Sequence, residues 1–141
     1  IFCFICSANN IFFIVNNAPQ SSRSCAMTLF ESVVERPAYL PASAVCIPLA
    51  STGTTIKAAA GGTVTFSGWK GSLGYMVVVS HGNGVQTYYG HCSKLYLSAG
   101  ATVSQGQTIA AVGSTGNSTG PHLHFEIRVN GIAYNPQNYL Y

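Results

Sequence analysis

The chain has 141 residues, of which only 6% are charged, and its formal net charge is +3. That length favours one domain with a sizeable core. The basic residues form no cluster, which argues against a nucleic-acid partner, and the absence of aspartate argues against any site that needs an Asp ligand or a carboxylate pair.

Residues 1–46 lack regular alternation of apolar and polar side chains, and we expect an irregular N-terminal segment with one short helix around residues 27–35. This segment is either a truncated signal or sequence unrelated to the rest of the fold. Its two short apolar patches are each shorter than the roughly 20 residues of a membrane span. The five cysteines have no regular spacing, so we expect no disulfide framework.

From residue 47 to residue 141, short β-branched and aromatic runs alternate with glycine-containing turns. We expect strands at 55–59, 63–67, 75–80, 85–89, 101–103, 108–112 and 122–127. Asn130-Gly131 predicts a two-residue hairpin turn after the last of them. The pattern predicts an all-β domain over 47–141, a compact antiparallel β-sandwich or half-barrel of short strands with a groove.

Three of the four histidines stand at the ends or in the course of these predicted strands. His122 and His124 are two residues apart, so a strand directs both to the same face. His91 ends an upstream strand-like run. Two imidazoles on one face can share a metal, can divide into one ligand and one general base, or can simply form a solvated strand face.

The motifs in order are Tyr-Tyr-Gly-His at 88–91 and the run Gly-Asn-Ser-Thr-Gly-Pro-His-Leu-His-Phe-Glu-Ile at 116–127. Together they closely resemble the lysostaphin and LytM-type zinc endopeptidases, which cut peptide cross-links of bacterial peptidoglycan. The resemblance covers about residues 52–136. It implies a tetrahedral zinc site with an open position for water, held in that family by His, Asp and His.

Carried over by position, the resemblance assigns His124 to a zinc ligand and His91 and His122 to a catalytic pair that handles protons and stabilises the oxyanion. It places one wall of the substrate groove in the glycine-rich loop 113–120. The residues that we expect to contact substrate are Tyr89, Asn117, Ser118, Thr119 and Gly120. His81 and Glu126 are interpreted as a structural turn residue and a surface acid, although Glu126 shares the face of His124.

At the positions of the family's first two zinc ligands, a histidine and an aspartate, this sequence has other residues. Ala42 stands where the first histidine ligand belongs and Cys46 where the aspartate belongs. Alanine cannot bind zinc, whereas a cysteine thiolate can, so the resemblance leaves His124 and Cys46 as the metal ligands of an incomplete zinc site. The segment is either divergent in an inactive copy, mistranslated, or a genuinely altered zinc site. The abrupt change there, from irregular sequence to regularly spaced strand-like runs, favours a damaged or incomplete gene copy.

The resemblance therefore implies a zinc metalloendopeptidase of the cell envelope or a secreted one. We expect it to be a monomer that acts on peptidoglycan stem peptides or cross-bridges, with no nucleic-acid partner and no membrane span. The alternative is a catalytically inactive wall-binding or hydrolase-regulating domain. A lipoyl- or biotinyl-type carrier is disfavoured because the turns at 82–84 and 106 contain no modifiable lysine.

Overall fold

The computed structural model describes residues 2–7, 10–15, 44–47 and 51–136, and it describes side chains within 51–136. Short strands and one 3-10 turn make up the regular structure of these residues. Their bounds are β1 Phe2–Ser7, β2 Asn10–Val15, β3 Ala44–Ile47, β4 Thr55–Lys57, β5 Gly62–Trp69, η2 Gly71–Leu73, β6 Tyr75–Gly82, β7 Val85–Leu95, β8 Thr102–Val103, β9 Thr108–Val112, β10 Leu123–Val129 and β11 Ile132–Tyr134.

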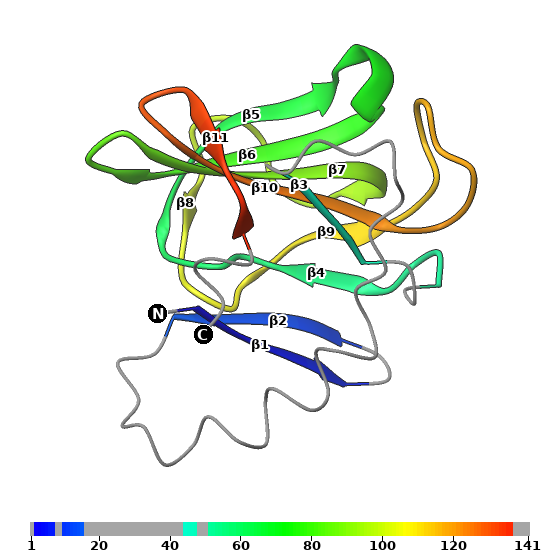
Figure 1. Cartoon of the computed structure of the whole chain (residues 1–141), viewed down its shortest axis with the longest axis horizontal. Helices are drawn as coiled ribbons and strands as arrows, with labels where there is room; N and C mark the ends of the chain where they lie inside the picture. The colour runs from blue at the N-terminus through cyan, green and yellow to red at the C-terminus, as the bar shows by residue number, and fades with distance from the viewer. Residues whose placement is uncertain (1, 8–9, 16–43, 48–50, 137–141) are drawn as a thin grey trace.

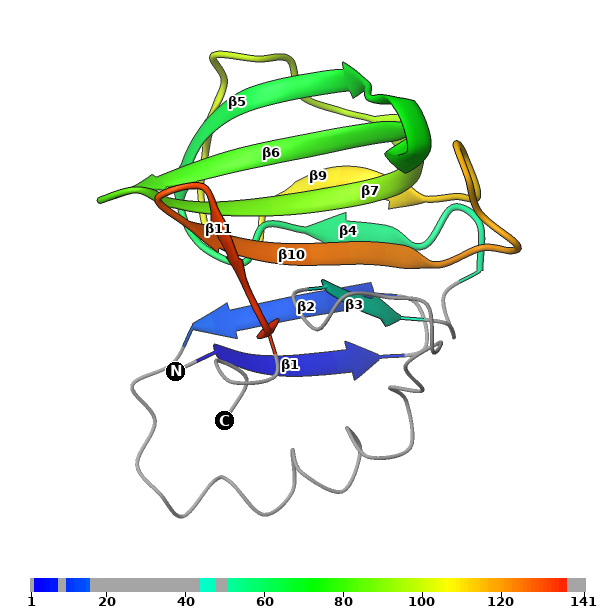
Figure 2. The ribbon, with the colours of Figure 1, turned by 45° about the horizontal axis from the view of Figure 1, so that its top comes forward.

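The strands join in one curled sheet with the order β1-β2-β4-β9-β7-β6-β5-β8, and β10 pairs with β7, β3 and β11. Only β2 and β4 pair in parallel; the other described pairs are antiparallel. Figures 1 and 2 show β5, β6, β7, β9 and β4 curving into an open barrel, with β10 along one side. The all-β half-barrel predicted from the strand pattern is confirmed.

Asparagine–glycine pairs form two of the hairpin turns. Asn130 and Gly131, between β10 and β11, have φ of 51° and 81°, and Asn83 and Gly84, between β6 and β7, have φ of 50° and 76°. Positive φ at both central residues is the requirement of a type I′ turn, whose twist matches that of the flanking strands. The hairpin predicted from Asn130-Gly131 is therefore present.

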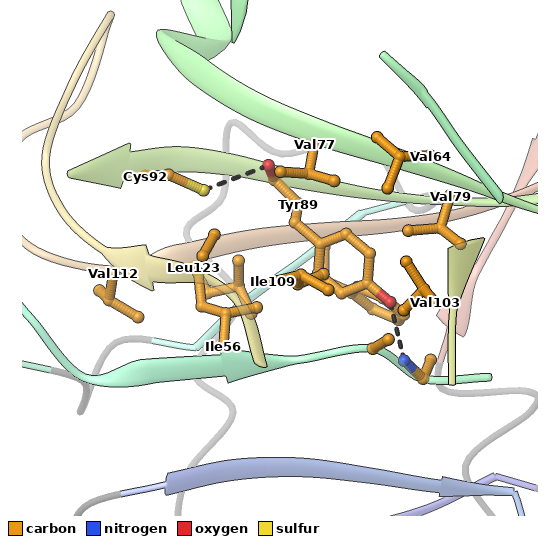
Figure 3. Close-up of a cluster of buried hydrophobic side chains, with 14 of the residues drawn as sticks. Ile56, Val64, Val77, Val79, Tyr89, Cys92, Val103, Ile109, Val112 and Leu123 are labelled. Carbon is orange, nitrogen blue, oxygen red and sulfur yellow. Dashed lines mark hydrogen bonds between the residues drawn. The ribbon is translucent and has the colours of Figure 1, made fainter. Parts of the chain in front are cut away.

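The core fills the inside of the curled sheet with alternate residues of its strands (Figure 3). Tyr89 lies at its centre, and its hydroxyl oxygen accepts a hydrogen bond of 2.9 Å from the amide of Ala59. The ring of Phe125 packs against it with centroids 5.4 Å apart. Cys92 is also fully buried, and burial raises the pKa of its thiol to about 12, which leaves it unreactive beside the histidines.

Strand β7 changes partner along its length, and His91 stands at the change. Residues 85–90 pair with β10, whereas the strand pairs with β9 from Cys92 onward. His91 has φ of 59°, a left-handed conformation that is uncommon for any residue except glycine. The strand continues past this position to Leu95, so His91 lies within β7 and not at its end as expected, and its side chain reaches the neighbouring loop at Thr115.

The N-terminal stretches that the structure describes are strands. β1 and β2 form an antiparallel hairpin inside the segment that we expected to be irregular, and β3 pairs with β10. The domain boundary at residue 46 stays a prediction, and the helix expected at 27–35 lies outside the described residues. Within the described part of the chain, no helix has the length and apolar character needed to cross a membrane.

Candidate active site

His91, His122 and His124 come together where β7 bends away from β10. The ring centroids of His91 and His122 are 4.5 Å apart, and those of His91 and His124 are 5.7 Å apart at an interplanar angle of 90°. His91 and His124 are buried, whereas His122 is half-buried. We call these three residues the histidine cluster.

The long loop 113–120 holds His91. Its Nδ1 lies 2.7 Å from the carbonyl oxygen of Thr115. Because that oxygen can only accept, Nδ1 carries the proton and Nε2 of the neutral ring keeps its lone pair. Burial lowers the pKa of His91; the Thr115 hydrogen bond opposes this, and the charges of His122 and His124 add to it. The neutral, proton-accepting form is therefore favoured.

His122 is held in the same way by the end of the loop. Its Nδ1 is 2.8 Å from the carbonyl oxygen of Gly120 and 3.2 Å from the hydroxyl of Ser118, which itself donates to Gly120 at 2.8 Å. The carbonyl fixes the proton on Nδ1, so the neutral ring of His122 also presents a free Nε2. His91 and His122 therefore both present Nε2 as a proton acceptor.

His124 has the opposite arrangement. Its Nε2 lies 2.8 Å from Oε1 of Glu126, and the other carboxylate oxygen accepts hydrogen bonds of 2.8 and 2.7 Å from Arg128. The Arg128 guanidinium stacks 4.4 Å from the ring centre of Tyr88 on β7. Nε2–H of His124 therefore donates to the carboxylate, and Nδ1 of the neutral ring keeps its lone pair, as is common for metal-binding histidines.

Glu126 is a buried carboxylate, not the surface acid that we expected. Its side chain is only 9% exposed. Burial by itself raises its pKa, but hydrogen bonds from His124 and Arg128, with their charges, outweigh burial and lower the pKa overall. The residue shares the face of His124 because the two are separated by one position on β10. The i, i+2, i+4 spacing of His124, Glu126 and Arg128 was the sequence signal for this chain of contacts.

The residues that the structure describes do not fit a complete zinc site. In those ranges, no group of three or more His, Cys, Asp or Glu could hold a metal ion. The backbone of Cys46 on β3 lies opposite His124 in the β3–β10 register, the place where a second ligand is needed. Ala42 lies outside the described residues. The assignment of His124 and Cys46 as zinc ligands remains a prediction.

Of the residues expected to contact substrate, Tyr89 does not agree with the structure. Its side chain is wholly buried in the core, because position 89 falls on the inner face of β7. Its neighbour Tyr88 takes the outer face, beside Arg128. The Tyr-Tyr pair left the choice between the faces open, and the strand register decides it.

The loop residues expected to contact substrate lie beside the histidine cluster. Asn117 and Thr119 are exposed, while Ser118 and Gly120 are half-buried. Ser118 and Gly120 contact His122 directly, so the structure shows that they position its ring. Contact of these four residues with substrate stays a prediction.

Gly74, which follows the η2 turn, lies against loop 113–120 and so supports His91. A Cβ built on Gly74 would overlap the carbonyl group of Thr115, and Gly74 itself has φ of 63°. We expect Gly74→Ala to lower the free energy of unfolding by at least about 1–3 kcal/mol, from backbone strain alone. Urea denaturation measures this. The matched control is Gly53→Ala, at φ of 92° with open space around it. Equal losses in both variants would show that the contact with Thr115 carries no energy.

His81 has a structural role on β6, away from the cluster. Its Nδ1 is 2.8 Å from the carbonyl oxygen of Gly61 and its Nε2 is 2.7 Å from the Thr87 hydroxyl, so neither nitrogen is left for a metal. Burial lowers the pKa of His81, and the Gly61 bond opposes that shift.

This depressed pKa makes stability depend on pH. The unfolded chain binds more protons than the folded chain as the pH falls below about 6.5, so the free energy of unfolding decreases on acidification and is regained as the pH rises through this range. We expect His81→Gln to flatten the dependence measured by urea unfolding between about pH 5 and 8, with His91 supplying the rest. An unchanged slope would contradict this origin.

Similarity to known proteins covers the part of the chain that forms the barrel and carries the histidine cluster. The model of peptidase family M23 matches residues 45–136. The DD-carboxypeptidase/endopeptidase Mpg of Neisseria meningitidis is 50% identical over 84 residues, which are 60% of this chain and 19% of that protein. The murein hydrolase activator EnvC of Escherichia coli is 46% identical over 91 residues, 64% of this chain and 22% of that protein. The chain thus spans about a fifth of the length of these curated relatives.

Among solved structures, the catalytic domain of the antimicrobial peptidase lysostaphin from Staphylococcus simulans superimposes with a TM-score of 0.67 and 30% identity. The match covers 76% of this chain and 86% of that domain. The family match includes β3 from its second residue onward and every described strand after it, and it contains the histidine cluster with its loop. The chain therefore belongs to peptidase family M23.

Proposed function

We propose that this chain is a zinc endopeptidase domain that acts on the peptide cross-links of peptidoglycan, and that its zinc site is incomplete as the sequence stands. The observation that carries the proposal is the histidine cluster, in which hydrogen bonds to Thr115 and Gly120 leave Nε2 of His91 and of His122 as free proton acceptors. Hydrolysis of a peptide bond needs such a base and an acid for the leaving amine.

The three histidines have different roles in this proposal. His91 and His122 lie 4.5 Å apart, close enough for both to reach one attacking water and one scissile group. His124 keeps Nδ1 for a metal, and Glu126 fixes that orientation. A bound zinc would supply Lewis-acid polarisation of the carbonyl. With one described ligand and Cys46 in place of the expected aspartate, we expect zinc to bind weakly.

A second candidate is a non-catalytic domain that binds the wall or regulates a separate hydrolase. The absence of a three-residue metal group within the described ranges favours it. A relative that covers 64% of this chain is named a murein hydrolase activator, which is compatible with such a role. Cell-envelope or secreted location follows from either candidate and is proposed with them.

Zinc content and wall clearance separate the two candidates. The purified chain is titrated with zinc while bound metal is counted by mass spectrometry, and turbidity of a cell-wall suspension is followed. An endopeptidase with an incomplete site clears walls when zinc is added and stops when a chelator removes it. A non-catalytic domain sediments with the walls and clears none at any zinc concentration. A chain that neither binds nor clears walls would contradict the endopeptidase and the wall-binding domain and would leave only regulation of a separate hydrolase.

A further inference from the structure

Aromatic side chains gather on the surface at one end of the barrel. Trp69 on β5 is 55% exposed, Tyr75 on β6 is 42% exposed, and Tyr96, just after β7, is 48% exposed. The rings of Trp69 and Tyr75 meet edge to face with centroids 5.2 Å apart. A group of large exposed aromatic side chains, here on two neighbouring strands and just after a third, is typical of an interaction surface.

Lys94 joins these rings into one surface. Its Nζ lies 5.5 Å from the ring centre of Tyr96, and the residue lines a hollow of about 190 Å³ with Tyr75, Ser93 and Leu95. This volume is smaller than that of a pocket for a whole ligand, so the hollow accommodates one substituent of a ligand lying across the surface. We call Trp69, Tyr75, Lys94 and Tyr96 the aromatic patch.

The aromatic patch adjoins the histidine cluster through a single residue. The amide of Tyr75 donates to Oγ1 of Thr115 at 3.1 Å, and the carbonyl oxygen of Thr115 accepts from His91 at 2.7 Å. Figures 1 and 2 show the β5–β6 connection and loop 113–120 at the same end of the barrel. A polymer bound at the histidine cluster can therefore extend onto the aromatic patch.

The charges around the aromatic patch suit an anionic or neutral partner. Within residues 51–136 the only acidic residue is Glu126, which is buried and paired with Arg128 and His124. Lys94 belongs to the patch, and Lys70 follows Trp69 directly, with its Nζ 5.5 Å from the Phe66 ring. A basic partner would meet only like charge there.

We propose that the aromatic patch binds the glycan strand of peptidoglycan while the histidine cluster addresses the attached peptide. Sugar rings present faces of C–H groups that pack on aromatic rings, their hydroxyl and acetamido groups suit the polar edges of Trp and Tyr, and the carboxylates of the attached peptides suit Lys94. The choice of this polymer rests on the proposed function.

Trp69 provides a direct probe because it is the only tryptophan of the chain. The full chain is titrated with chitohexaose, a peptide-free N-acetylglucosamine oligomer, and with peptidoglycan fragments that retain their peptides. We expect a saturable change in tryptophan fluorescence with both. Tyr75→Ala and Tyr96→Ala each weaken binding of both ligands at least about 10-fold. Lys94→Gln weakens binding of the peptide-bearing fragments more than that of the neutral oligomer.

Tyr134→Ala is the matched control, since Tyr134 is 39% exposed on β11, which among the described strands pairs with β10 alone. No fluorescence change with either ligand, or an equal loss in Tyr134→Ala, would overturn the proposal. Self-association that Trp69→Ala abolishes, without sugar binding, would mark the patch as a contact between copies and also overturn it.

Failure of this proposal and of the proposed function can be told apart. Glycan binding is measured without zinc and does not need His122. Glycan binding without any wall clearance therefore leaves the aromatic patch in place and removes the endopeptidase. Wall clearance without glycan binding removes the aromatic patch as a glycan site and leaves the endopeptidase in place.

Discussion

Replacing Ala42 by His and Cys46 by Asp is expected to raise the zinc affinity of the chain at least about 100-fold, because loss of a partner that merely supports a ligand already costs 10–100-fold. Position 46 lies directly opposite His124 in the β3–β10 register. Opposite positions of an antiparallel pair share one face of the sheet, so an aspartate at 46 is placed to join His124 at one metal. Isothermal titration with zinc, or competition with a chromophoric chelator, measures the gain.

The control for this variant adds His124→Ala to the two replacements. If the new ligands act with His124, the triple variant loses the gain. A double variant with unchanged affinity would show that the assignment of positions 42 and 46 is wrong. A gain that survives the loss of His124 would place the metal elsewhere.

The second large effect concerns His122, the proton-accepting histidine that follows loop 113–120. In the variant with Ala42→His and Cys46→Asp, we expect His122→Ala to lower kcat for cross-link cleavage by about 10²- to 10⁴-fold, the usual contribution of general acid–base catalysis. The reason is the hydrogen bond from Nδ1 to Gly120, which leaves Nε2 as the base. Release of peptide fragments from purified walls measures kcat.

His81→Ala is the control for His122→Ala. It removes a histidine on β6 of the same sheet, and both ring nitrogens of that histidine are hydrogen-bonded to protein groups. It should leave kcat within a few-fold of the parent once both proteins are shown to be folded. A fall of less than about ten-fold in His122→Ala would remove that residue from proton transfer.

Much of the fold could be predicted because local rules determine it. Asn130 and Gly131 adopt the positive φ values that asparagine and glycine tolerate, and the β-branched runs between glycine turns form strands. Tyr88 and Tyr89 show the limit of such rules. Both suit a strand, and only the register with β6 and β10 decides which one enters the core.

The site was predictable where spacing alone places side chains and unpredictable where distant segments meet. Glu126 was recognised as sharing a face with His124, but its burial depends on Arg128 and Tyr88, and Tyr88 lies on another strand. The His91 ring is held by a carbonyl of loop 113–120, a contact between distant segments that no local pattern reveals. Likewise, the meeting of β3 with β10 depends on a pairing of residues far apart in the sequence.

The most direct measurement of the central claim is mass spectrometry of the fragments released from cross-linked peptidoglycan by the variant with Ala42→His and Cys46→Asp, loaded with zinc. We predict fragments with broken peptide cross-links on intact glycan strands, absent when His122 is replaced by Ala. Cleaved glycan strands, or no release at all from a zinc-loaded and folded protein, would contradict the account.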